Sequence, residues 1–117
     1  MVPDRIYLLG HSMGGKAAPR ITAADPSIVG LVMLAADTQP MHETAVRVGR
    51  YLADLATGPG ADEAVSTMVR QAASVSGPDF TPDSPSELLP LGISAAYWFD
   101  LRAYDPVAPA AQWLARC

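Results

Sequence analysis

A serine lies between two glycines at residues 10–14, where the sequence reads Gly-His-Ser-Met-Gly. An apolar run precedes this motif and small residues follow it, so we expect a strand, a sharp turn and a helix. On such a turn Ser12 projects its hydroxyl out of the sheet, where it can attack a carbonyl carbon. We expect Gly10 and Gly14 to remove side chains that would collide where strand and helix nearly touch. The motif therefore predicts a nucleophile, with the Met13 N–H at the helix N-terminus as an oxyanion donor. The alternative is a serine that only caps the helix.

Candidate partners for this serine follow the next apolar run. Asp37 comes directly after that run and His42 follows five residues later. Ligands of open α/β sheets bind at the carboxyl ends of the strands, so a Ser12–His42–Asp37 arrangement is one prediction, with His42 as base and Asp37 as the acid that orients it. In the alternative, Asp37 is a turn or cap residue and His42 is the exposed start of a helix. The second histidine of the chain, His11, is expected to have a packing role.

Two apolar runs around the motif indicate the fold class. Strands over residues 5–10 and 28–36, joined by a helix over 14–24 that Pro19 should bend or split, form a parallel β-α-β unit. The fold class expected is therefore α/β. Amphipathic patterning then predicts a helix over 42–57, with Val48, Tyr51, Leu52 and Leu55 on one face. A second helix is expected over 62–76, with Asp62 as its N-cap. Further helices are expected over 94–104 and 107–116, with one helical turn at 86–91.

Composition excludes several classes of function. The net charge of −4 and the scattered arginines give no basic patch, so we expect no nucleic-acid partner. No apolar run approaches the roughly 18 residues of a membrane span, and residues 1–5 do not resemble a signal peptide, so a cytoplasmic protein is expected. The single cysteine, Cys117, cannot form an internal disulfide. No grouping of His, Cys and carboxylates has metal-ligand spacing, so neither a metal nor another cofactor is expected.

The motif and its surroundings together resemble a known family. The sequences Gly-His-Ser-Met-Gly-Gly (10–15), Leu-Ala-Ala-Asp (34–37) and the aromatic stretch at 97–106 are similar to the central portion of bacterial esterases and thioesterases of the α/β-hydrolase fold. The resemblance implies a partial α/β-hydrolase fold in a single domain, with the nucleophile elbow in 1–37 and a helical cap and connection in 38–117. It implies that Ser12 is the nucleophile and that the Met13 N–H is an oxyanion donor. The oxyanion loop of the family lies well before the nucleophile, whereas only nine residues precede the motif here, and the late acid and histidine would lie beyond Cys117. The chain is therefore expected to be truncated at both ends.

The function expected is hydrolysis of a small carboxylic ester or thioester through an acyl-enzyme on Ser12. The aromatic residues Tyr97 and Trp98 either line an acyl pocket or pack the helix that carries them. The alternative function is a catalytically incomplete hydrolase fragment with a role in structure or assembly. Because two strands alone leave open edges, we also expect a homo-oligomer or a complementing hydrolase fragment as partner.

Overall fold

The computed structural model describes residues 5–56 and 58–115, which fall into two compact units. Unit 1 takes in the described residues up to Thr38 and those from Asp105 onward, and unit 2 is Gln39–Tyr104. Unit 1 holds both strands and unit 2 is helical, so the fold class is α/β. Among the described residues no helix has the length and apolarity to cross a membrane. The expectations for Cys117 and for the first four residues fall outside the described part of the chain.

A β-α-β unit forms the first part of unit 1. Strand β1 (Ile6–His11), helix α1 (Met13–Ala24) and strand β2 (Ile28–Leu34) follow one another, and the strands pair in parallel with Leu9 opposite Val32. The prediction of two parallel strands is confirmed. Between residues 5 and 115, leaving aside the undescribed residue 57, no other strand is found.

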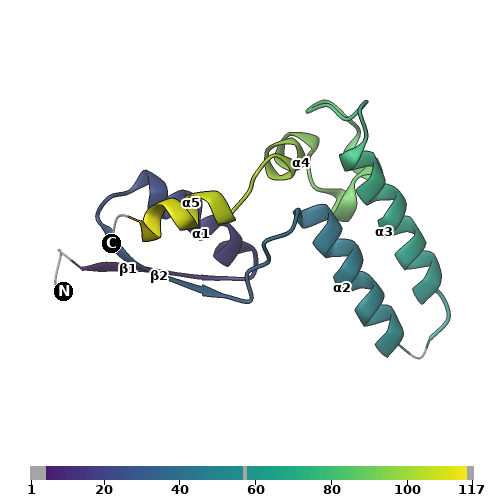
Figure 1. Ribbon diagram of the computed structural model, residues 1–117. Coiled ribbons are helices and arrows are strands. Elements are labelled where there is room, and N and C mark those ends of the chain that lie inside the picture. The colour runs from purple at the N-terminus through teal and green to yellow at the C-terminus, as the bar shows by residue number, and fades with distance from the viewer. Residues whose placement is uncertain (1–4, 57, 116–117) are drawn as a thin grey trace. The chain divides into compact units, whose positions relative to one another are not determined.

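Helix α1 packs on both strands through a face of small residues. It lies with helix α5 (Val107–Leu114) on the same side of the two strands (Figure 1). Its buried residues recur at helical spacing: Gly15, Lys16, Ala18, Pro19 and Thr22. Of the two effects expected of Pro19, a bend or a split, the split does not occur, because the helix continues to Ala24. The proline ring is fully buried, so packing against the rest of unit 1 offsets the lost backbone hydrogen bond.

The opposite face of this sheet is apolar and exposed. Successive side chains of a strand point to opposite faces of the sheet. The face turned away from α1 therefore includes Tyr7 and Leu9 of β1 and Val32 and Leu34 of β2. All four are exposed, Leu9 to 61%. The Tyr7 ring lies over Gly30, its partner in the register, where a Cβ would collide with the ring.

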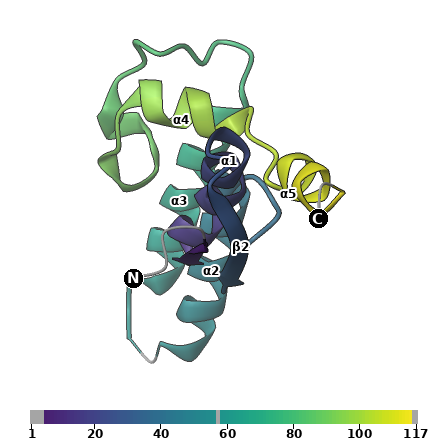
Figure 2. The same cartoon turned by 90° about the vertical axis from the view of Figure 1, so that its left-hand side faces the viewer.

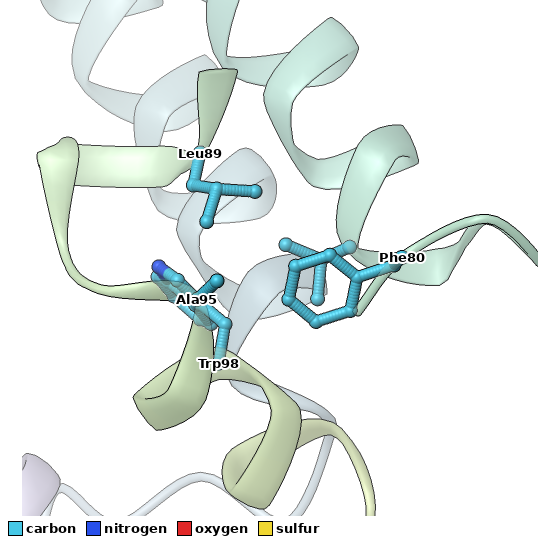
Figure 3. Packing of buried hydrophobic residues seen from close by; sticks show 5 residues of the cluster. Phe80, Leu89, Ala95 and Trp98 are labelled. Atoms are coloured by element: carbon cyan, nitrogen blue, oxygen red, sulfur yellow. The ribbon is translucent and has the colours of Figure 1, made fainter. Parts of the chain in front are cut away.

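Unit 2 is a helical hairpin closed at one end by a third helix. Helices α2 (Met41–Leu55) and α3 (Ala61–Ser76) run antiparallel, and α4 (Ala95–Arg102) lies at the end where α3 finishes (Figure 2). Two short 3-10 turns, η1 (Ser86–Leu88) and η2 (Pro90–Gly92), precede α4. The core at this end consists of Val75, Phe80, Leu89, Ala95 and Trp98, whose side chains face one another (Figure 3).

Two details of the hairpin concern expectations from the sequence. The residues expected to share one apolar face of α2 are all exposed: Val48, Tyr51, Leu52 and Leu55. The helices instead approach through Gly49, where an added Cβ would lie 2.6 Å from the Met68 sulfur. The N-cap of α3 is Gly60 in the left-handed region (φ 99°), and Asp62 lies within the first turn. Glycine adopts that conformation without strain, so it can end the loop where an aspartate was expected.

Arg102 ties α4 to the end of α3. Its Nη1 donates to the carbonyl oxygens of Val75 (3.1 Å) and Gly77 (3.5 Å). The guanidinium also lies over the rings of Phe80 (5.0 Å to the centroid) and Phe99 (4.7 Å). The last carbonyls of a helix lack partners within the helix, so this arginine supplies donors for them. A planar guanidinium stacks on rings and donates at its edge at the same time, whereas an ammonium does not.

We therefore predict that Arg102→Lys lowers the free energy of unfolding of unit 2 by about 1–2 kcal/mol. The measurement is urea unfolding followed by tryptophan fluorescence in a Trp113→Phe background, where Trp98 reports on unit 2. The control is Arg70→Lys, which alters an exposed side chain bonded to the Thr67 hydroxyl and should change stability by less than about 0.5 kcal/mol. Equal losses in both variants would contradict the role given to Arg102.

Candidate active site

Ser12 occupies the single residue between β1 and α1 in a strained conformation. Its φ of 54° and ψ of −120° put a residue with a side chain in the region that glycine prefers, which costs about 1–3 kcal/mol. The Ser12 N–H donates to Leu34 O of the neighbouring strand (2.9 Å), and Ser12 O accepts the first helical hydrogen bond from Lys16 N (3.0 Å). The Ser12 side chain is exposed and makes no capping hydrogen bond. The backbone thus holds the turn while the serine itself stays exposed.

The turn at Ser12 depends on two glycines, of which Gly10 was expected and Gly15 was not. A Cβ added at Gly10 would collide with the carbonyl group of Gly14, 2.6 Å from its carbon, and would lie 2.7 Å from the Gly15 Cα. A Cβ at Gly15 would lie 3.0 Å from the Ala36 Cβ. At Gly14, by contrast, it would meet no atom within 4 Å, so the expectation that Gly14 prevents a collision is wrong. Its own Cα faces open space because only its carbonyl group lies against β1.

The segment that leaves β2 runs along the first turn of α1. Ser12 contacts Leu34 through its amide, Gly15 fits against Ala36, and Lys16 Nζ donates to the carbonyl oxygen of Asp37 (3.1 Å). Asp37 is half-buried and belongs to unit 1 together with Ser12. Two of the residues expected at the site, Ser12 and Asp37, are therefore carried by adjoining segments.

Lys16 was not among the expected site residues. It is 4% exposed, and burial lowers the pKa of its ammonium, while the carboxylates of Asp37 and Asp105 oppose that shift. The signal in the sequence is a lone lysine four residues after Ser12, in a helix whose buried face otherwise carries small residues or proline.

His42 lies at the start of α2, in unit 2. It is 5% exposed, so the alternative of an exposed helix start does not describe it. Its Nε2 is 2.9 Å from the Ser76 hydroxyl of α3. The role of His42 as base remains a prediction. His11, at the end of β1, is exposed rather than packed.

The aromatic residues of α4 lie in different surroundings. Trp98 is fully buried in the core of unit 2, and its Nε1 donates to Pro90 O (3.2 Å). Tyr97 is partly exposed, and its ring packs edge-on against Trp98 at 6.4 Å. These contacts account for Trp98 as a packing residue.

Elsewhere in unit 2 an open groove of about 640 Å³ follows α2 and α3, and His42, Tyr51 and Ser76 are among its lining residues.

Among residues 5–56 and 58–115, no three His, Cys, Asp or Glu side chains lie together in a way that could hold a metal ion.

Comparison with known proteins gives one distant relative. The chain is 30% identical to Esterase EstD of Thermotoga maritima over 107 residues, which are 92% of this chain and 24% of that protein. The chain thus spans about a quarter of the length of this curated relative. No protein-family model matches the chain, and no solved structure matches it. An esterase is therefore among the relatives of this sequence.

The glycine contacts lead to a prediction about stability. We expect Gly10→Ala to lower the free energy of unfolding by about 1–3 kcal/mol, because the alanine Cβ would meet backbone atoms that cannot rotate away. Gly14→Ala is the matched control, and we expect it to leave stability unchanged or to raise it by up to about 1 kcal/mol, since alanine favours the helix. Urea unfolding monitored by circular dichroism measures both. The interpretation fails if Gly14→Ala is the more damaging change.

Proposed function

We propose that this chain carries the nucleophile of an esterase that acts on a carboxylic ester or thioester. Ser12 Oγ forms a bond to the carbonyl carbon of the substrate. The bond from that carbon to the alcohol oxygen or thiol sulfur then breaks, and the leaving group takes up a proton. Water attacks the resulting acyl-serine, releases the acid and restores the hydroxyl. The Met13 N–H, at the first position of α1, acts as one oxyanion donor.

The observation that carries this proposal is the backbone at Ser12. A strained serine with an exposed hydroxyl, placed between a parallel strand and a helix, has no structural benefit that a glycine would not supply better. Strain of this kind persists where it serves a site and the surrounding structure holds it. The esterase relative supports the same chemistry. The proposal therefore takes the turn at Ser12 to be a nucleophile elbow of the α/β-hydrolase fold.

The remaining catalytic roles follow from the sequence as proposals. Asp37 is the candidate acid, because it leaves β2 at the same edge of the sheet as Ser12 leaves β1. His42 is the candidate base, and Tyr97 is the candidate for a substrate contact because part of its ring is exposed.

A second function is favoured by the exposed apolar face of the sheet. Tyr7, Leu9, Val32 and Leu34 expose surface that a stable protein normally covers, so the chain could supply Ser12 to an assembly while lacking turnover alone. A second copy of the chain or a complementing hydrolase segment would cover that face. Labelling of Ser12 without hydrolysis by the isolated chain would favour this second function.

A fluorophosphonate probe tests the nucleophile directly. We expect the probe to label the chain at Ser12 and to leave Ser12→Ala unlabelled, with the modified peptide identified by mass spectrometry. Ser66→Ala, at an exposed serine of α3, is the control and should label like the unaltered chain. Labelling that survives in Ser12→Ala would remove this serine from the mechanism.

Hydrolysis of p-nitrophenyl butyrate tests the base. If His42 accepts the Ser12 proton, His42→Gln should lower turnover by about a hundredfold or more, the usual effect of losing a general base. Ser76→Ala removes the hydrogen-bond partner of His42 in unit 2 and should change turnover by less than about threefold. Full turnover in His42→Gln would assign the base to another group.

A further inference from the structure

The exit from β2 contains a second strained residue next to the turn at Ser12. Ala35 has a φ of 49°, in the left-handed region that residues with a Cβ avoid. Such a conformation persists only where the surroundings hold it. The residue before it, Leu34, accepts the hydrogen bond from Ser12 N, and the residue two positions after it, Asp37, accepts the hydrogen bond from Lys16 Nζ. The first turn of α1 thus holds Ala35 on both sides.

The ammonium of Lys16 lies where three segments of unit 1 meet. It projects from α1, donates to the backbone of Asp37 and lies close enough to the carboxylates of Asp37 and Asp105 for both to act on it. The Asp105 carboxylate in turn accepts a hydrogen bond from Val107 N (2.8 Å) at the start of α5. One buried charge therefore faces the exit of β2 and the entrance of α5 together.

Burial makes the protonated form of Lys16 less favourable in the folded chain than in the unfolded chain. Desolvation lowers the pKa of folded Lys16 below its ordinary value of 10.5, and the two carboxylates only oppose that shift. Between the folded and the unfolded pKa the unfolded chain binds more protons, so the free energy of unfolding rises with pH in that range. Below it, the charged lysine favours the unfolded state. A buried ammonium that contacts the backbone beside a candidate nucleophile is more readily explained by a role in the site than by a role in the core.

We propose that Lys16 is a positioning residue, whose buried ammonium fixes the turn at residues 35–37 against the first turn of α1. It thereby fixes where the backbone of Asp37 lies relative to Ser12. This inference rests on the proposed role of Ser12, since it concerns the geometry of the same site. The substitution Lys16→Met keeps an unbranched apolar side chain, one atom shorter, and removes the ammonium.

The first experiment uses the fact that Lys16 is the only lysine in the sequence. In protein labelled with ¹³C at lysine Cε, a single side-chain signal reports its titration. We expect a midpoint below 10.5, and a further decrease in Asp37→Asn and in Asp105→Asn, because each carboxylate raises this pKa. Asp25→Asn, at the far end of α1, is the control and should leave the midpoint unchanged. A midpoint in the folded chain equal to that in urea would overturn the inference.

The second experiment measures order and reactivity in Lys16→Met. Backbone ¹⁵N relaxation should show the order parameters of residues 35–38 falling from about 0.85 to below about 0.6, while those of β1 stay high. The rate of fluorophosphonate labelling at Ser12 should fall at least tenfold. Arg20→Met removes an exposed cation from the same helix and should change that rate by less than twofold.

The outcomes separate this inference from the proposed function. If the unaltered chain is not labelled at Ser12, the esterase proposal fails. The titration midpoint of Lys16 and the order parameters of residues 35–38 still test the role of Lys16 in that case. If residues 35–38 keep their order in Lys16→Met, the positioning role is overturned whatever the labelling shows. Should Lys16→Met fail to fold, the titrations of the aspartate variants decide.

Discussion

The close approach of β1 and α1 at Gly10 determines the rest of unit 1. Because the Gly14 carbonyl group occupies the space that a Cβ at Gly10 would need, strand and helix can meet this closely only at a glycine. The chain then has one residue in which to reverse, and that residue is Ser12, which takes a positive φ. An exposed serine between strand and helix is the geometric result. The amide of the same residue joins the turn to β2, so this backbone contact also sets where the second strand ends.

Much of the fold could be predicted, because apolar runs and motif spacing are local properties of a sequence. The strands at Ile6–His11 and Ile28–Leu34 and the helices that follow lie close to where patterning indicated. The failures have tertiary causes. Pro19 did not split its helix because burial of its ring compensates, and the hairpin closes through Gly49, which the patterning did not single out. Neither is visible in residue types alone.

The candidate site was predictable to the extent that its residues are neighbours in sequence. Ser12 followed from the glycine spacing, and Asp37 followed from the end of an apolar run. The contact of Lys16 with Asp37 joins residues 21 positions apart, and the contact of His42 with Ser76 joins residues 34 apart. Such pairs depend on how a helix lies on a strand or on another helix, which no spacing rule specifies. The glycine that packs against the β2 exit is also Gly15 rather than Gly14, a distinction that motif matching does not make.

The order of the units along the chain has a consequence for how this molecule can change. Unit 2 is one continuous stretch, Gln39–Tyr104, inserted into a unit whose two parts come before and after it. Asp105 follows the insertion directly and Asp37 lies one residue before the last residue ahead of it, and both act on the ammonium of Lys16, so the chain leaves and re-enters unit 1 near the same point. An insertion with adjacent ends can be lengthened, shortened or exchanged without moving the strands that receive it. The helical unit is thus free to diverge between relatives faster than the turn that carries the serine.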